Sequence, residues 1–173
     1  MKKLIFLFLA CVITLTSCSN EKDFDKNLKE AYNETVKVLL TSTLICDNIS
    51  STWRTAIFDH KGPDGRYCSD FNEALADLRT TYKNAGILDS ISKYKTNMQS
   101  ATSKLNNPPA SRKECYNDFI EIVGEVSSLS RMATDPSGSL QSYSNQTNEL
   151  ASEISKKIDQ FNIKYSQLIK ENK

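Results

Sequence analysis

The fold of this chain is decided by residues 24–58, which read FDKNLKEAYNETVKVLLTSTLICDNISSTWRTAIF. Apolar residues recur there at intervals of three and four, the period of an α-helix with one face turned toward a core. The stripe consists of Phe24, Leu28, Ala31, Val38, Ile45, Ile49, Trp53 and Ala56, widened by Tyr32, Val36, Leu39 and Cys46. The segment predicts a long amphipathic helix that ends at the turn formers of residues 60–65.

A second helical pattern covers residues 71–105, with Ser69 or Asp70 as its N-cap. Gly86 interrupts this pattern. The glycine could either kink the helix or break it in two, and we expect a kink. The pattern stops at residues 106–109, because two prolines there lack the amide donor that a helix needs.

The third helix begins after Ser111, its predicted cap, and ends at residues 134–138. The fourth has a nearly heptad stripe, made of Leu140, Tyr143, Thr147, Leu150, Ile154, Ile158, Phe161, Tyr165 and Leu168. No alternating strand pattern occurs, and short connections favour antiparallel neighbours. We therefore expect an all-α fold: an antiparallel up-down four-helix bundle with long helices, its second helix kinked near Gly86.

The amino terminus has the three zones of a secretory signal: Lys2 and Lys3, an apolar stretch of residues 4–13, and the tetrapeptide Leu15-Thr16-Ser17-Cys18. The apolar stretch is about half the length needed to span a bilayer. The tetrapeptide resembles the lipobox of bacterial lipoproteins, in which a Leu stands three places before the lipidated Cys and small residues lie between them.

The lipobox resemblance covers only the first 18 residues, and it implies a signal peptide of residues 1–17 that is cut between Ser17 and Cys18. Cys18 would then carry fatty acyl chains such as palmitate, which anchor a protein stably to a membrane. Residues 18–23 would be a short tether, and residues 24–173 the bundle domain. Because Ser19 is not Asp, the resemblance favours the outer membrane, with the periplasmic and surface faces both open.

Composition excludes several classes of function. Removal of Lys2 and Lys3 with the signal leaves 20 basic against 21 acidic residues, so no electrostatic attraction to nucleic acid is expected. The single histidine, His60, excludes a multi-histidine metal site, and no phosphate-binding loop is present. We expect no enzyme, cofactor or metal. A thiol enzyme using Cys68 and His60 is a minor alternative, and Asp59, Asp64 and Asp70 only faintly suggest calcium.

Three cysteines remain in the mature chain: Cys46, Cys68 and Cys115. Bundle geometry separates them by more than the 7 Å or so that a disulfide spans between Cα atoms, so we expect free thiols. Cys46, with apolar neighbours, is expected in the core and Cys68 at the surface. The sequence Asp89-Ser90-Ile91 matches a short pattern for O-glycosylation at Ser90.

The heights of the predicted helices leave the first hairpin extending about 18 Å beyond the other two helices. Its apolar residues either pack back onto the body, which we favour, or form a contact surface. The candidate partner-binding residues at this end are Trp53, Arg54, Ile57, Phe58, His60, Arg66 and Tyr67.

The sequence thus predicts a lipid-anchored, non-catalytic binding module for an envelope protein or glycan. A structural, self-associating envelope lipoprotein, pairing through the fourth helix and the apolar hairpin, is the alternative. The oligomeric state is left open.

Overall fold

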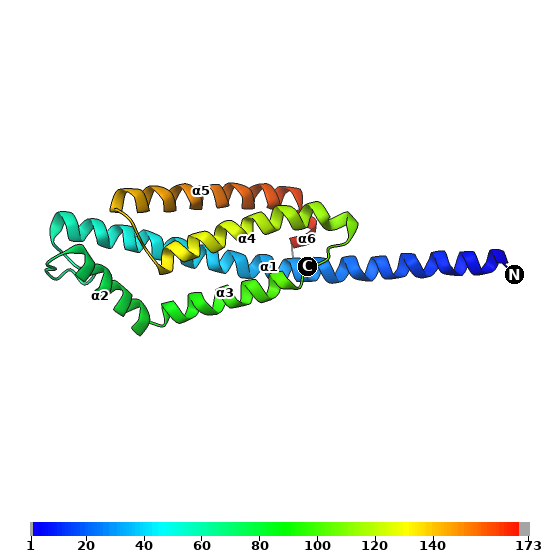
Figure 1. Ribbon diagram of the computed structural model, residues 1–173, viewed down its shortest axis with the longest axis horizontal. Coiled ribbons are helices and arrows are strands. Elements are labelled where there is room, and N and C mark those ends of the chain that lie inside the picture. Colours follow the sequence, from blue (N-terminus) through cyan, green and yellow to red (C-terminus); the bar gives the residue numbers. More distant parts are fainter. Residues whose placement is uncertain (1, 170–173) are drawn as a thin grey trace.

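The computed structural model describes the backbone of residues 2–169 and the side chains of residues 20–169. The described residues form six α-helices, one 3-10 helix and no β-strand, which confirms the all-α class (Figure 1). The α-helices are α1 (Lys2–Asp59), α2 (Phe71–Asn84), α3 (Ile87–Ser103), α4 (Lys113–Thr134), α5 (Leu140–Lys164) and α6 (Ser166–Ile169), and the 3-10 helix η1 (Ala110–Arg112) precedes α4.

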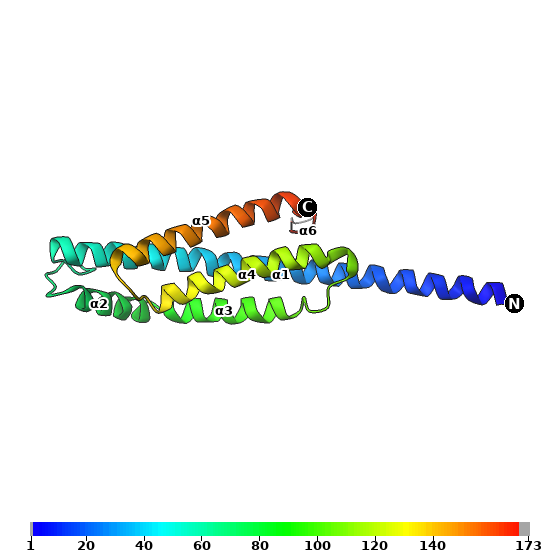
Figure 2. The same cartoon turned by 45° about the horizontal axis from the view of Figure 1, so that its top comes forward.

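The longest helix, α1, packs against each of the five other α-helices (Figure 1). Both views show α2 and α3 returning along α1, α4 running back beside α1, and α5 returning once more beside α4 (Figure 2). The amino-terminal part of α1, in blue, projects beyond the other helices. Residues 18–23, expected as a tether, are helical. Ser17 and Cys18 also lie within α1, but their side chains are outside the described residues.

The predicted kink near Gly86 is a break between two helices. Gly86 has a left-handed backbone with φ of 69°, and its N–H donates to the carbonyl oxygen of Lys83 at 3.1 Å, which ends α2. The first hydrogen bond of the next helix, α3, runs from the N–H of Ser90 to the carbonyl oxygen of Gly86 at 3.0 Å. Glycine adopts this conformation at little cost because it has no Cβ, so the chain changes direction here instead of bending gradually.

One predicted helix cap is confirmed and another is wrong. The Asp70 side chain accepts hydrogen bonds from two backbone N–H groups at the start of α2, as a cap does. Ser111 instead lies in η1, and its hydroxyl donates to a carboxylate oxygen of Glu21 at 2.6 Å. The neighbouring Arg112 guanidinium binds Asp25, with 2.8 Å between Nε and Oδ1. Contacts with α1 have thus replaced the local cap, and they join the start of α4 to the first helix.

The predicted apolar stripes form the core. Buried on α1 are Phe24, Leu28, Ala31, Val38, Leu39, Ile45, Cys46, Ile49, Trp53 and Ala56. From α5, the heptad-like stripe contributes Tyr143, Thr147, Ile154 and Phe161 as buried residues. The Phe161 ring lies 5.7 Å from that of Phe119 on α4 and 6.0 Å from that of Tyr32 on α1, measured between centroids. The inward faces of α1, α4 and α5 therefore meet in one core.

Two isoleucines of α5 test this core directly. Ile154 is fully buried and Ile163 is 81% exposed. We expect Ile154→Ala to lower the free energy of unfolding by about 2–5 kcal/mol, because it removes buried methyl groups and leaves a cavity. Ile163→Ala is the matched control and should change stability by no more than about 0.5 kcal/mol. Urea unfolding followed by circular dichroism measures both, and equal losses for the two variants would contradict the packing of α5.

Candidate functional site

The tip of the molecule, residues 54–68, consists of the last residues of α1 and the ordered turn that follows them. The N–H of Gly62 donates to the carbonyl oxygen of Arg66 at 2.8 Å, and the N–H of Cys68 donates to that of His60 at 3.0 Å. The Asp64 carboxylate binds the guanidinium and the backbone N–H of Arg66, and these bonds lower the pKa of Asp64. The sequence-predicted turn is therefore closed by its own hydrogen bonds.

Six of the seven predicted contact residues lie exposed on the tip: Arg54, Ile57, Phe58, His60, Arg66 and Tyr67. The exposed fraction is 70% for Phe58 and 78% for Tyr67, which is high for large aromatic side chains. The rings of His60 and Tyr67 lie 6.3 Å apart. Aromatic and basic groups thus share the surface at this end of the molecule.

Trp53 does not reach the surface, which corrects its prediction as a contact residue. Its side chain is 4% exposed, and its ring lies 5.4 Å from Phe71 of α2 and 6.0 Å from Tyr143 of α5. The favoured expectation that the apolar residues of this hairpin pack internally therefore holds for Trp53. Trp53 therefore packs in the core next to the tip, whereas the side chains of Phe58 and Tyr67 are exposed to solvent.

The expectation that Cys68 is exposed is wrong. This side chain is 2% exposed and packs with Ala56, Ala74 and Phe71. Burial and the neighbouring carboxylates, of which Glu73 has the larger effect, raise the pKa of its thiol and so disfavour the nucleophilic thiolate. The interaction of the His60 ring is with Tyr67. This environment is unfavourable for a thiol nucleophile with a histidine base.

Cys46 and Cys115 are also buried, and all three thiols are free. Cys46 lies in the core, as predicted, with its sulfur 4.0 Å from the carbonyl oxygen of Leu129. Burial raises the pKa of Cys46 and raises that of Cys115 to about 12. The fold thus holds these side chains as small apolar groups.

Among the described residues, no three His, Cys, Asp or Glu side chains are grouped so that they could hold a metal ion. Two of the three carboxylates with a faint calcium pattern are otherwise bound: Asp64 pairs with Arg66, and Asp70 caps α2. Ser90 is half-buried in the first turn of α3 and donates to the carbonyl oxygen of Gly86 at 2.8 Å.

The structure also has a surface that sequence reasoning missed, which we call the α1–α5 groove. Two adjoining hollows, of about 440 and 860 Å³, lie between these helices and both include Asp47. Leu40 and Leu44 border the first hollow and are 65% and 59% exposed. A sequence signal existed, because these leucines lie four residues apart and outside the predicted buried stripe.

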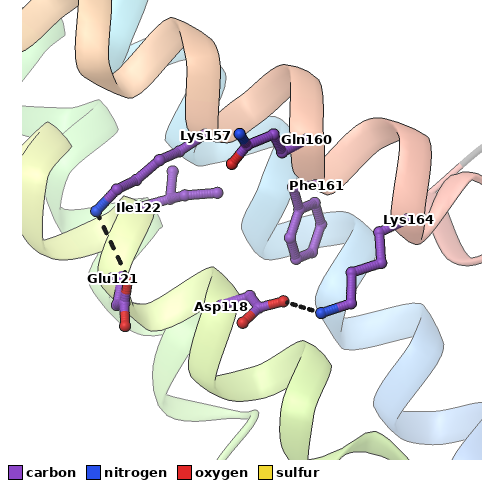
Figure 3. Close-up of a pocket in the computed structure, with 7 residues that line it drawn as sticks. All are labelled: Asp118, Glu121, Ile122, Lys157, Gln160, Phe161 and Lys164. Carbon is purple, nitrogen blue, oxygen red and sulfur yellow. Dashed lines mark hydrogen bonds and ion pairs between the residues drawn. The ribbon is translucent and has the colours of Figure 1, made fainter.

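A charged crevice of about 300 Å³ lies between α4 and α5 (Figure 3). Lys164 binds Asp118 and Glu114, each with 2.8 Å between nitrogen and oxygen, and Lys157 binds Glu125 at 2.5 Å. The hydrogen bond from Lys164 lowers the pKa of Asp118. Because each lysine already has a carboxylate partner, the crevice joins two helices and has little free charge for a ligand.

Comparisons with protein-family models, with curated proteins and with solved structures find no match for this chain. Within the residues that were described, no helix is both long and apolar enough to cross a bilayer.

The buried thiols lead to a test on the lipid-free chain that begins at Ser19. We expect all three cysteines to react with iodoacetamide at neutral pH at least tenfold more slowly than free cysteine, because burial and raised pKa values suppress the thiolate. In denaturant without reductant, all three should react. Rapid, selective alkylation of Cys68 would favour the thiol enzyme, and fewer than three reactive thiols would reveal a disulfide.

Proposed function

We propose that this chain is a lipid-anchored, non-catalytic contact module of the bacterial cell envelope, which binds an envelope protein or glycan through its tip. The anchor is Cys18 of the lipobox-like sequence, after removal of residues 1–17. The outer membrane is the proposed location, with the domain on its periplasmic or surface face. A domain held by acyl chains needs no membrane-spanning helix.

The observation that carries this proposal is the exposure of aromatic residues at the end of α1 remote from Cys18. Phe58 and Tyr67 are more than two-thirds exposed although the adjacent Trp53 is buried. From Cys18 to Phe58, α1 is about 60 Å long at 1.5 Å per residue. After the proposed removal of residues 1–17, the anchor and the tip would lie at opposite ends of what remains of α1, which suits a module that presents its tip to a partner.

The chemistry of the tip favours a protein or glycan over other partners. Aromatic rings pack on apolar protein surfaces and on the faces of sugars, and Tyr and Arg are enriched at binding hot spots. Arg54 and Arg66 are exposed beside Phe58 and Tyr67. A near-neutral mature chain lacks the positive field that nucleic acids require.

For the architecture, we count α2 and α3 together as one arm, which makes the domain an up-down four-helix bundle with a broken second arm. In this arrangement α1 ends and α2 begins at the tip. The stripe of α5 is used inside this bundle, where Tyr143, Ile154 and Phe161 are buried. Self-association through that stripe would need the bundle to open.

The anchor is tested by expressing the full precursor with a labelled fatty acid. Cys18→Ser should abolish labelling and release the domain from the membrane fraction, because the acylated thiol is lost. Cys11→Ser is the matched control: Cys11 lies in the segment that is removed, so label should remain. Persistent label in the Cys18 variant would refute the proposed anchor.

The tip is tested by affinity capture from an envelope extract followed by titration of the captured partner. Phe58→Ala combined with Tyr67→Ala should weaken binding about tenfold or more, the loss typical of aromatic hot spots. Ile163→Ala, an equally exposed apolar side chain of α5, should leave binding unchanged. If the double variant captures the same partners with equal affinity, the tip is not the contact.

A further inference from the structure

The solvent-facing side of α1 carries an acidic and a basic residue two helical turns apart. Asp47 and Arg54 differ by seven residues and therefore lie on one stripe of the helix. Both side chains are exposed, and the ion pairs within residues 20–169 include neither of them. Each charge is available to a partner.

Exposed apolar side chains flank these two charges on both sides. Leu40 and Leu44 precede Asp47 and are 65% and 59% exposed. Ile57 and Phe58 follow Arg54 and are 40% and 70% exposed. These four are the large apolar residues that α1 leaves most exposed among its described side chains, so the stripe is unusually apolar for the outside of a bundle.

The neighbouring helix leaves room for a second helix along this stripe. The residues of α5 that line the α1–α5 groove carry no charge, and most of them are small: Leu140, Gln141, Ser144, Asn148, Ala151, Ser152 and Ser155. The hydroxyls of Ser50 and Ser144 lie 3.1 Å apart, where the two helices meet. Small residues allow another helix to approach closely. Because the α5 residues are uncharged, they do not repel or pair with the charges of Asp47 and Arg54.

The stripe is complementary to itself in one register. A two-fold axis between Ser50 and Ser51 places Asp47 of one copy level with Arg54 of the other, because both residues are equally far from the axis. The same axis places Leu44 level with Ile57 and close to Phe58. An isologous interface needs this reciprocity, in which residue i meets j and j meets i.

We propose that the α1–α5 groove binds a second copy of this chain, with the two α1 helices antiparallel and crossing near Ser50 and Ser51. A parallel pair is disfavoured, because it would bring Asp47 against Asp47 and Arg54 against Arg54. The inference goes beyond the proposed envelope partner by naming a further partner, and it shares only Arg54, Ile57 and Phe58 with the tip.

Antiparallel pairing directs the two amino-terminal ends away from each other. Measured along the helices, the two Asn20 residues of a pair lie about 90 Å apart at 1.5 Å per residue. If Cys18 is anchored as proposed, the pair joins copies held on two facing membrane surfaces. This consequence alone depends on the proposed anchor.

Charge exchange tests the pairing in the lipid-free chain from Ser19, which contains the whole described core. Analytical ultracentrifugation of the wild type should show a concentration-dependent dimer. Asp47→Arg and Arg54→Asp should each weaken it at least about tenfold, because like charges then face each other. The double exchange should restore the dimer, since the two charges have only traded places.

A matched control exchanges two charges on α3, Asp89→Arg with Lys93→Asp, both exposed and away from the groove, and it should leave the dimer unchanged. A wild type that is monomeric at every concentration, or a double exchange as weak as the single ones, overturns the proposal. A monomer that still captures an envelope partner leaves the proposed function standing. A dimer that captures no envelope partner would support the pairing and contradict the proposed function.

Crosslinking tests the register. Ser51→Cys lies at the two-fold axis and should form a disulfide-linked dimer under mild oxidation, while the three native thiols are buried. Asn33→Cys lies on the same stripe but about 50 Å from its copy in the antiparallel pair, so it should stay monomeric. Equal crosslinking of both variants would indicate a parallel pair and overturn the antiparallel one.

Discussion

Burial of the apolar stripe on α1 is the constraint on which the rest of the structure depends. Leu28, Val38, Ile45 and Trp53 are each 5% exposed or less, and α1 packs against every other α-helix. Each fully buried side chain of this size contributes about 1.5–3 kcal/mol, so the stripe is a large share of what opposes conformational entropy. The helices α2, α3, α4 and α5 all pack against α1, and together they cover this one apolar surface.

The same helix has a second face whose properties follow from the first. Because the stripe is covered on the inside, the outer face of α1 meets solvent, and Leu40 and Leu44 remain there beside the α1–α5 groove. At the tip, the Trp53 ring packs against Phe71 of α2 and Tyr143 of α5, whereas the side chain of Phe58, five residues further along α1, is 70% exposed. One continuous helix therefore organises the core, the groove and the tip, and any function at the tip depends on the packing beneath it.

Sequence patterns predicted that the helices form. They were less reliable at positions where two local conformations or side-chain environments have similar energy. Gly86 allows either a bend or a left-handed stop, and the packing of α2 against α1 and α3 selects the stop. Ser111 could cap a helix, but Glu21 of α1 offers its hydroxyl a charged acceptor. Cys68 follows a polar loop and was expected at the surface, yet Ala56 and Ala74 leave a space that a small thiol fills.

The sequence by itself determined the all-α class, the turns at residues 60–65, 106–109 and 134–138, the residues of the core stripes and the lipobox-like amino terminus. Those features depend on period, capping and turn chemistry, which are local. Only the tertiary structure decided that Trp53 is buried while Phe58 and Tyr67 are not, and that Leu40 and Leu44 line a groove. Which side of an amphipathic helix is covered depends on neighbours far away in the chain, because burial is a property of packed helices and not of any one of them.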